Sequence, residues 1–192
     1  RLFSPRGLQY MFSEHTAFRR KNVFLLCASA YASFDFQLVG AYPKKKYKWG
    51  YFPKVRTVEE LKGKLDKESK MPLSILWVGR MLDWKHPEVI IEIAKMCKDE
   101  KMNVKFHMIG NGELCEHIKR LIAENRLENH ITLDTFKDNA AVIEDMIASD
   151  IFLATSDYQE GWGAVINEAM SCACVTIASH AMGAAPFLIK NN

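Results

Sequence analysis

Two basic residues, five positions apart, follow the apolar run at residues 74–78. The stretch reads GRMLDWK over residues 79–85, so Arg80 and Lys85 stand between an expected strand end and an expected helix start. From there both side chains can reach one anion, which the unpaired N–H groups of a helix start also favour. Taken alone, the same spacing favours two solvated cations in a loop.

A second stretch places glycines and carboxylates around another helix start. It reads QEGWGAVINEAM over residues 159–170, with Glu160 in the expected loop and Glu168 in the early helix. Gly161 and Gly163 lack a Cβ atom, so the backbone there can approach a ligand closely. Amides suit an anion and carboxylates accept from hydroxyls, so this layout fits a diphosphate flanked by two polyols. The alternatives are a solvent-facing turn for Glu160 and an exposed helix position for Glu168.

The elements that position both stretches alternate regularly from Pro72 onward. Strands are expected at residues 74–78, 104–109, 131–136, 151–155 and 174–179. Helical spacing is expected at residues 86–100, 113–125, 140–148 and from 164 onward. This alternation predicts an α/β fold, a doubly wound parallel sheet with ligands outside the carboxyl ends of its strands. Both stretches and Gly110, which follows the second strand, then share one rim.

The first 56 residues have a different pattern. Helices are expected at residues 6–21 and 30–41, a buried strand at 22–29 and an extended connection at 49–55. Because one strand cannot form a sheet, we expect residues 1–56 to be the tail of a preceding domain and residues 57–192 to be the main domain. Residues 57–70 fit either a short surface helix or a linker. The chain opens with Arg rather than Met and stops shortly after the fifth expected strand, so we expect truncation at both ends.

Composition excludes several classes of protein. The chain has 192 residues, 48% of them hydrophobic and 26% charged, which is typical of a soluble globular protein and not of disorder or a disulfide scaffold. No apolar run reaches the roughly 18 residues that a membrane span needs. The five cysteines are odd in number and lack CxxC spacing, so we expect small buried hydrophobes in a reducing compartment.

Charge is distributed unevenly along the chain. Residues 1–70 hold 15 Lys and Arg against 6 Asp and Glu, whereas residues 71–192 hold 11 against 17. The basic run at residues 44–48 could meet anionic lipid or nucleic acid. Because no nucleic-acid-binding motif accompanies the run, we favour a solvated loop and expect no nucleic acid partner.

The two stretches together resemble a known family. Gly-Arg-x4-Lys after the first strand, with Glu-Gly-x-Gly-x4-Glu-Ala-Met after the fourth, is similar to the donor-binding domain of family-4 retaining glycosyltransferases of the GT-B fold. The run GNGE at residues 110–113 and Ser156 match the same pattern. The resemblance covers residues 73–188 and departs from the family at Ala173 and Cys174, where Gly and Pro are usual, and at Phe187, where an acidic residue is usual.

The resemblance implies roles for individual residues. Arg80 and Lys85 would hold the donor diphosphate and stabilise the leaving group, Glu160 would face the donor sugar, and Glu168 would accept bonds from ribose hydroxyls. The residues that would border the donor are Gly79, Gly110, Gly161, Trp162, Gly163, Ala164 and Val165, with the base near Phe136.

The resemblance also implies an activity. The whole protein would move a sugar from a nucleoside-diphosphate sugar to a glycan or lipid-linked acceptor, with retention, in polysaccharide or glycolipid assembly. We expect a cytoplasmic location, with peripheral contact at the inner, anionic membrane face. Residues 57–192 would bind the donor, and residues 1–56 would end the acceptor domain. The sequence contains no Asp-x-Asp pair, so we expect no metal ion and no cofactor besides the donor substrate.

Other functions fit parts of the sequence. A dinucleotide-binding oxidoreductase would use Gly110-x-Gly112, but Cys115 stands at the third fingerprint position and the motif follows the second strand instead of the first. A non-catalytic nucleotide-sugar binding module would keep the donor site without the acceptor domain, and the fragment alone is expected to be inactive. Among the histidines, His107 is expected in the core, and His86 is expected to be solvated or to touch phosphate.

Overall fold

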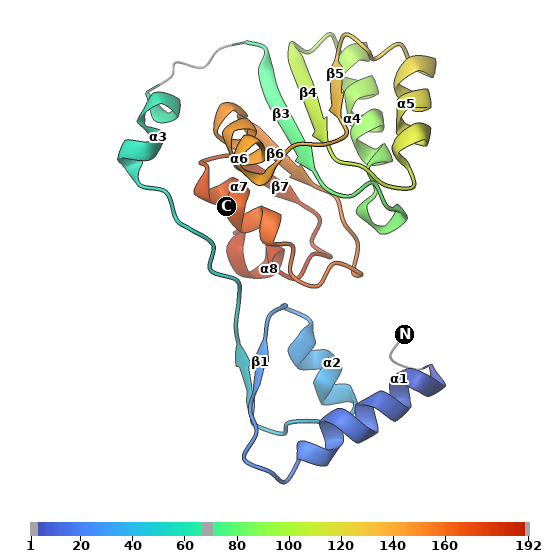
Figure 1. Cartoon of the computed structure of the whole chain (residues 1–192), viewed down its shortest axis with the longest axis vertical. Coiled ribbons are helices and arrows are strands. Elements are labelled where there is room, and N and C mark those ends of the chain that lie inside the picture. Colours follow the sequence, from blue (N-terminus) through green and yellow to red (C-terminus); the bar gives the residue numbers. More distant parts are fainter. Residues whose placement is uncertain (1–3, 67–70, 191–192) are drawn as a thin grey trace. The chain divides into compact units, whose positions relative to one another are not determined.

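The computed structural model describes residues 4–66 and 71–190, and its contacts divide the chain into two units, Arg1–Tyr51 and Phe52–Asn192. Each unit has its own sheet and its own helices (Figure 1). The larger unit contains both stretches in which the sequence predicts ligand-binding residues.

The part of the larger unit that the structure describes is built on a five-stranded sheet in which every pairing is parallel. Its order is β5-β4-β3-β6-β7, so the direction in which the chain adds strands reverses between β3 and β6. Along the chain the strands are β3 (Leu73–Val78), β4 (Val104–Ile109), β5 (Ile131–Asp134), β6 (Ile151–Ala154) and β7 (Val175–Ala178). The predicted α/β fold with a doubly wound parallel sheet is therefore confirmed. The reversal places the loops after β3 and β6 side by side, where such sheets bind ligands.

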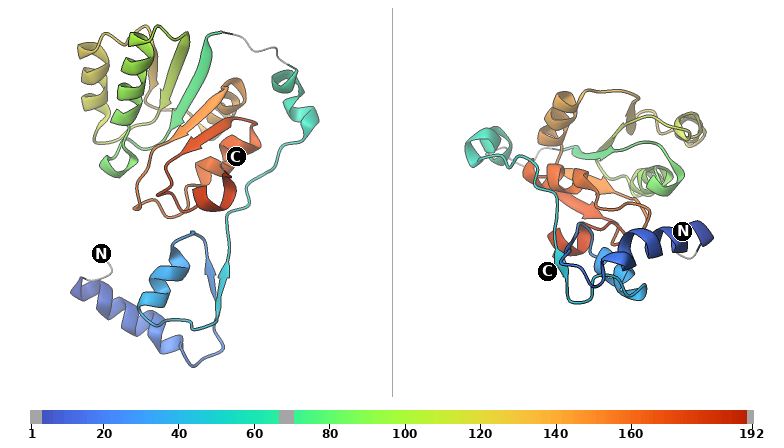
Figure 2. Two further views of the ribbon diagram at one scale, coloured as in Figure 1. Left: turned by 180° about the vertical axis from the view of Figure 1, so that it is seen from behind. Right: turned by 60° about the horizontal axis from the view of Figure 1, so that its bottom comes forward.

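Helices cover both faces of this sheet (Figures 1 and 2). One face carries α4 (Glu88–Asp99) and α5 (Cys115–Glu124). The other carries α6 (Asn139–Ala148), α7 (Ala164–Ser171) and the short α8 (Ala185–Leu188). Helix α6 begins where the Asp138 carboxylate accepts from the backbone N–H of Ala141 at 2.8 Å, a side-chain cap. The predicted helices are thus present, each within a few residues of its expected bounds.

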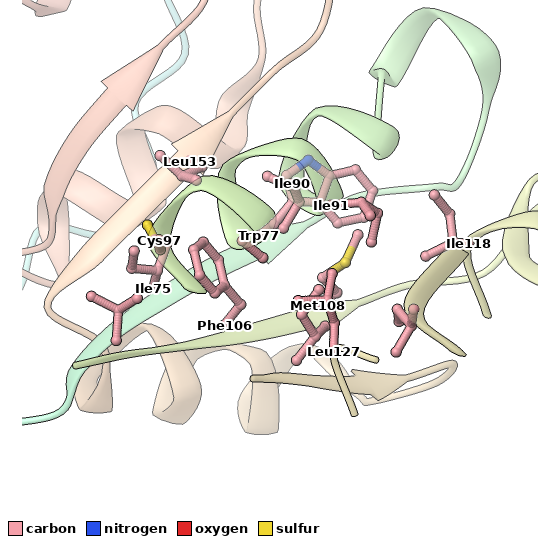
Figure 3. Packing of buried hydrophobic residues seen from close by; sticks show 14 of the residues in the cluster. Ile75, Trp77, Ile90, Ile91, Cys97, Phe106, Met108, Ile118, Leu127 and Leu153 are labelled. Carbon is pink, nitrogen blue, oxygen red and sulfur yellow. The ribbon is translucent and has the colours of Figure 1, made fainter. Parts of the chain in front are cut away.

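Strand β3 joins the two hydrophobic layers, because neighbouring residues of a strand point to opposite faces of a sheet. Ile75 and Trp77 pack with α4 and α5 in the cluster shown in Figure 3. Leu76, between them, is fully buried among residues of α6 and α7. Burial of such a side chain contributes about 1.5–3 kcal/mol. The loop that begins at Gly79 therefore starts from a strand fixed on both faces.

All five cysteines are buried and unpaired, as the sequence predicts. Burial raises the pKa of the Cys27, Cys97 and Cys174 thiols. A raised pKa keeps a thiol protonated and unreactive, so these cysteines act as packing residues.

Helix α3 (Val58–Leu65) precedes the sheet, begins at a side-chain cap and contacts two later helix ends through Lys64. At its start, the Thr57 hydroxyl accepts from the backbone N–H of Glu60, and the Glu60 carboxylate accepts from the backbone N–H of Thr57. Near its end, Lys64 Nζ donates to the backbone oxygens of Ser149 at 2.6 Å and Cys172 at 2.9 Å, which lie just after α6 and α7. Of the two alternatives for residues 57–70, the helix is correct for 58–65, while residues 67–70 lie outside the described part.

The smaller unit contains helix α1 (Pro5–Tyr10), which continues through a π-helical turn and a 3₁₀ turn to Phe18, and helix α2 (Ala32–Leu38). Strand β1 (Leu25–Cys27) pairs in parallel with β2 (Lys46–Lys48). The expectation of a single strand is therefore wrong, and the loop expected at residues 44–48 is wrong for residues 46–48 only. Residues 46–48 form a strand because their backbone bonds to β1, while the side chains of Tyr47 and Lys48 stay exposed.

None of the helices in residues 4–66 and 71–190 is long and apolar enough to cross a bilayer.

Gly110→Ala is expected to lower the free energy of unfolding by at least about 2 kcal/mol. Gly110 has a φ of +150°, and a Cβ atom there would lie 1.8 Å from the backbone oxygen of Gly79. Urea unfolding followed by far-ultraviolet circular dichroism measures the loss.

Gly63→Ala on α3 is the matched control, because a Cβ atom at Gly63 meets nothing within 4 Å. It is expected to stabilise the helix by about 0.5–1 kcal/mol. Equal effects of the two substitutions would contradict the close packing of the loops after β3 and β4.

Candidate functional site

The loops after β3 and β4 are joined by backbone contacts at the rim of the sheet. The N–H of Met81 donates to the oxygen of Asn111 at 2.9 Å, and the N–H of Gly79 donates to the oxygen of Ile109 at 3.0 Å. The position that a Cβ atom of Gly110 would take is filled by the Gly79 carbonyl. Gly110 therefore brings two loops together, and its close approach to a nucleotide, expected from the sequence, stays a prediction.

Lys85 and Glu160 form an ion pair between the loops after β3 and β6. Their side chains are only 16% and 15% exposed, so both charges are largely removed from water. The Ser156 hydroxyl also contacts the Glu160 carboxylate, at 3.4 Å, and Lys85 Nζ lies 4.5 Å from the centre of the Trp84 ring. The structure thus brings together two of the three residues expected to be catalytic. It pairs them with each other, which the sequence did not indicate.

Two hydrogen bonds to backbone oxygens also join the loops after β3 and β6. The Thr155 hydroxyl donates to the backbone oxygen of Lys85 at 2.6 Å, and the N–H of Asp157 donates to the oxygen of Trp84 at 3.0 Å. His86 Nε2 lies 3.4 Å from Oδ2 of Asp157, so His86 contacts a carboxylate. The backbone N–H of Gln159, followed by other hydrogen-bond donors that include His86, lowers the pKa of Asp157.

Arg80 follows Gly79 directly and its side chain is exposed at the rim. It belongs to the same loop as Lys85, which is the placement that the spacing predicts. A Cβ atom on Gly79 would lie 3.9 Å from Cδ of Lys85, so the Lys85 stem folds back over the start of this loop. The loop therefore presents one enclosed cation and one exposed cation.

The turn before α7 is shaped by glycine. Gly163 has a φ of +83°, and a Cβ atom there would lie 2.4 Å from Cε of Met182 and 3.4 Å from Cγ of Glu160. Gly161 has open space around it, and Ala164 and Val165 form the half-buried first turn of the helix. The turn thus sets the start of α7 beside Glu160.

Trp162 points into the core. Its side chain is 6% exposed, its Nε1 donates to Oδ1 of Asn167 at 2.7 Å, and its ring centre lies 5.8 Å from that of Phe187. Only the backbone of Trp162 is therefore placed to border a ligand. Phe187, where the resemblance seen in the sequence leads us to expect an acidic residue, packs here against an aromatic ring.

Glu168 is half-buried on the last part of α7. Burial raises the pKa of its carboxyl, and the positive charge of Arg56 acts in the opposite direction. Arg56 itself donates to the Ser171 hydroxyl at 2.9 Å, one turn of helix further on. A carboxyl in this setting is incompletely hydrated, which suits an acceptor for ligand hydroxyls.

A cluster of charged side chains that the sequence analysis missed lies close to Phe136 along the chain and includes its neighbour Lys137. Lys137 Nζ lies 3.1 Å from Asp134 and 2.7 Å from Asp145, while His107 Nε2 lies 2.8 Å from Asp134. His107 first, and then Lys137, lower the pKa of the Asp134 carboxyl.

The placement of His107 corrects an expectation. Its side chain is 20% exposed and faces carboxylates, so His107 is not a core residue. Phe136, 85% exposed, stands beside this cluster at the carboxyl end of β5. The alternating pattern VKFHM at residues 104–108 could have signalled it, because it places His107 on the same face of the strand as Lys105.

No three His, Cys, Asp or Glu side chains within residues 4–66 and 71–190 are grouped so as to hold a metal ion. The candidate site of the described chain is therefore made of cations, carboxylates and backbone amides.

The fold and the converging loops define an α/β protein whose candidate ligand site lies at the switch point of a parallel sheet. Residues 58–192 match the family model for glycosyl transferases group 1. The chain belongs to this family, the GT4 glycosyltransferases.

Two curated relatives illustrate the match. An uncharacterized glycosyltransferase of Methanocaldococcus jannaschii is 32% identical over 132 residues, which are 68% of this chain and 33% of that protein. The amylovoran biosynthesis glycosyltransferase AmsK of Erwinia amylovora is 30% identical over 139 residues, which are 70% of this chain and 34% of that protein. The chain thus spans about a third of the length of these relatives.

Solved structures are similar over nearly the whole chain. HepE of Anabaena, in complex with UDP, gives a TM-score of 0.76 at 19% identity and covers 98% of this chain and 52% of that one. TarM gives a TM-score of 0.74 at 21% identity and covers 97% of this chain and 34% of that one. At these identities the likeness shows the fold, a partial match to GT-B glycosyltransferases.

Glu168→Gln is expected to raise the free energy of unfolding at pH 7. Burial raises the pKa of the Glu168 carboxyl, so the charged form disfavours the folded state. For a carboxyl with a raised folded pKa, this penalty is full above the folded pKa and vanishes below the unfolded value of 4.5. Urea unfolding at pH 7 and at pH 4 should therefore show a gain at pH 7 that shrinks at pH 4.

Glu124→Gln, at an exposed position of α5, is the control and is expected to change the free energy of unfolding by less than about 0.5 kcal/mol. A loss of stability at pH 7 in Glu168→Gln, or a gain of the same size at both pH values, would contradict the burial of this carboxyl.

Proposed function

We propose that the larger unit binds the nucleoside-diphosphate sugar of a retaining glycosyltransferase. The observation that carries the proposal is the pairing of Lys85 with Glu160 beside the start of α7. A cation, a carboxylate and a helix start meet there at the carboxyl ends of adjacent strands. These are the groups that a diphosphate between two polyols requires.

The diphosphate would be held by Arg80, Lys85 and the first backbone amides of α7. Lys85 is already oriented, because Glu160 and the Thr155 hydroxyl fix its side chain and backbone. A diphosphate would compete with Glu160 for the ammonium group of Lys85. The exposed Arg80 would close over the ligand from the same loop.

The polyols and the base would lie on either side of the diphosphate. Glu160, when released from Lys85, would accept from hydroxyls of the donor sugar, and Glu168 would accept from ribose hydroxyls. The exposed ring of Phe136 offers a face for the base. Uracil is the base we propose, since solved structures of HepE and of TarM were determined with UDP.

The transferase chemistry follows from charge. As the bond from the anomeric carbon to the diphosphate breaks, negative charge grows on the leaving phosphate oxygens. Lys85, Arg80 and the helix start are placed in advance against that charge, and removal of one such donor typically costs about 2.7–4 kcal/mol in the barrier. Fixed cations would in this way serve in place of a metal ion. Retention of configuration is proposed from membership of the family.

The acceptor is proposed to be a glycan or a lipid-linked glycan. AmsK acts in amylovoran biosynthesis, and a third relative, of Staphylococcus aureus, is a poly(ribitol-phosphate) alpha-N-acetylglucosaminyltransferase. Residues 1–56 would then end the acceptor domain, and the whole protein would work in polysaccharide assembly at the cytoplasmic face of the membrane.

The dinucleotide-binding alternative loses support from Gly112 as well as from Gly110. A Cβ atom on Gly112 would lie 2.5 Å from the backbone oxygen of Met81. Both glycines are thus needed to pack two loops together, a role that does not require a dinucleotide.

UDP is expected to raise the melting temperature of the chain more than GDP, ADP or CMP. A ligand present at a hundredfold excess over its Kd stabilises the folded state by about 2.7 kcal/mol. Arg80→Ala and Lys85→Ala are each expected to lose most of the shift, because each removes a diphosphate contact. Differential scanning fluorimetry measures all combinations.

Lys119→Ala, on α5, is the matched control for loss of a cation and should keep the full shift. In a longer protein that carries this chain and an acceptor domain, both site variants should lower turnover of a UDP-sugar at least about a hundredfold. A full UDP shift in both variants would overturn the site, and turnover that is absent despite UDP binding would favour a non-catalytic binding module.

A further inference from the structure

A hydrogen-bonded relay connects the core to the backbone of Lys85. Trp77, 2% exposed on β3 and visible in Figure 3, donates from Nε1 to Oγ1 of Thr155 at 2.9 Å. The same Thr155 oxygen donates to the backbone oxygen of Lys85 at 2.6 Å. A hydroxyl has one proton, so accepting from Trp77 leaves that proton free to point at Lys85.

The peptide group after Lys85 depends on this external restraint. The first backbone N–H groups of α4, from Val89 and Ile90, bond to the oxygens of His86 and Pro87 and leave the Lys85 oxygen to Thr155. His86 has a φ of +49°, a left-handed value that is uncommon for a residue with a side chain. Such a conformation persists where surrounding contacts impose it.

Trp77 also packs against the loop after β3, at Gly79. A Cβ atom on Gly79 would lie 3.3 Å from ring atoms of Trp77 and 3.9 Å from Cδ of Lys85. The indole ring and the stem of Lys85 therefore flank the same glycine. The Trp77 side chain thus packs against the start of the loop at Gly79. Through Thr155 it also fixes the backbone carbonyl of Lys85.

We propose that Thr155, oriented by Trp77, is a positioning residue that fixes Lys85 for contact with a phosphate group. The inference rests on the donor-binding function proposed above and assigns a role to two residues outside the ligand contacts. A lysine ammonium on a four-carbon stem is flexible, so it gains most from a fixed backbone. Placing the charge before the ligand arrives reduces the ordering that binding requires.

The test begins with variants of Thr155. Thr155→Val keeps the shape of the side chain and removes the hydroxyl, and it is expected to raise the Kd for UDP about tenfold, the effect of one lost hydrogen bond to the loop. Thr155→Ser retains the hydroxyl and should restore the Kd to within about twofold of wild type. Isothermal titration calorimetry with UDP on the 192-residue chain measures both.

Thr155→Val leaves the indole N–H of Trp77 without its acceptor, which could itself weaken UDP binding by disturbing the core. A second variant tests this alternative explanation. Trp77→Phe combined with Thr155→Val takes away the donor and the acceptor together. This double variant should fold with a cooperative melting transition and still bind UDP about tenfold more weakly than wild type. Wild-type affinity in the folded double variant would overturn the proposal.

A double-mutant cycle with Lys85→Met separates positioning from general stabilisation. If Thr155 acts through Lys85, then Thr155→Val changes the Kd for UDP by less than about twofold once the ammonium is gone. An equal loss in both backgrounds, or wild-type affinity in Thr155→Val, would overturn the inference while leaving the proposed function intact. Failure of the wild-type chain to bind UDP would overturn the proposed function and this inference with it.

Discussion

The contact between Lys85 and Glu160 is the constraint on which the candidate site depends. The two residues are 75 positions apart, and their pairing joins the loops of the two strands between which the sheet reverses its order. Because both side chains are mostly shielded from solvent, each charge needs a partner at all times. Under the proposed function, a negatively charged ligand would replace Glu160 on Lys85 while its own hydroxyl groups bonded to the freed carboxylate. We propose that this exchange favours a ligand that carries both phosphate and polyol.

The rest of the larger unit supports that contact. Strand β3 is buried on both faces and delivers Gly79 at a fixed place, and Gly110 allows the next loop to pack directly on it. Thr155 and Asp157 then bond the loop after β6 to the backbone before α4. Ala173, which stands where the resemblance seen in the sequence leads us to expect Gly, has a φ of +55°, a left-handed value that suits a residue without a Cβ atom. The contacts that pack these loops together are thus the same contacts that position the residues of the candidate site.

Much of the larger unit could be predicted from the sequence, because its strands are continuous apolar runs separated by helices of clear periodicity. The pairing of Lys46–Lys48 with Leu25–Cys27 could not, since lysine-rich strands lack an apolar signature and their partner is distant along the chain. The spacing of Arg80, Lys85 and Glu160 predicted a shared rim, but not that two of them pair. The cluster of His107, Asp134, Lys137 and Asp145 was missed because it draws on two strands, a helix and a loop.

A crystal structure of the chain with UDP tests the central claim most directly. The account predicts a phosphate oxygen of UDP about 3 Å from Nζ of Lys85. The Glu160 carboxylate should have moved away from Nζ, and the diphosphate should face the first amides of α7. UDP bound elsewhere, with the pair of Lys85 and Glu160 still intact, would contradict it.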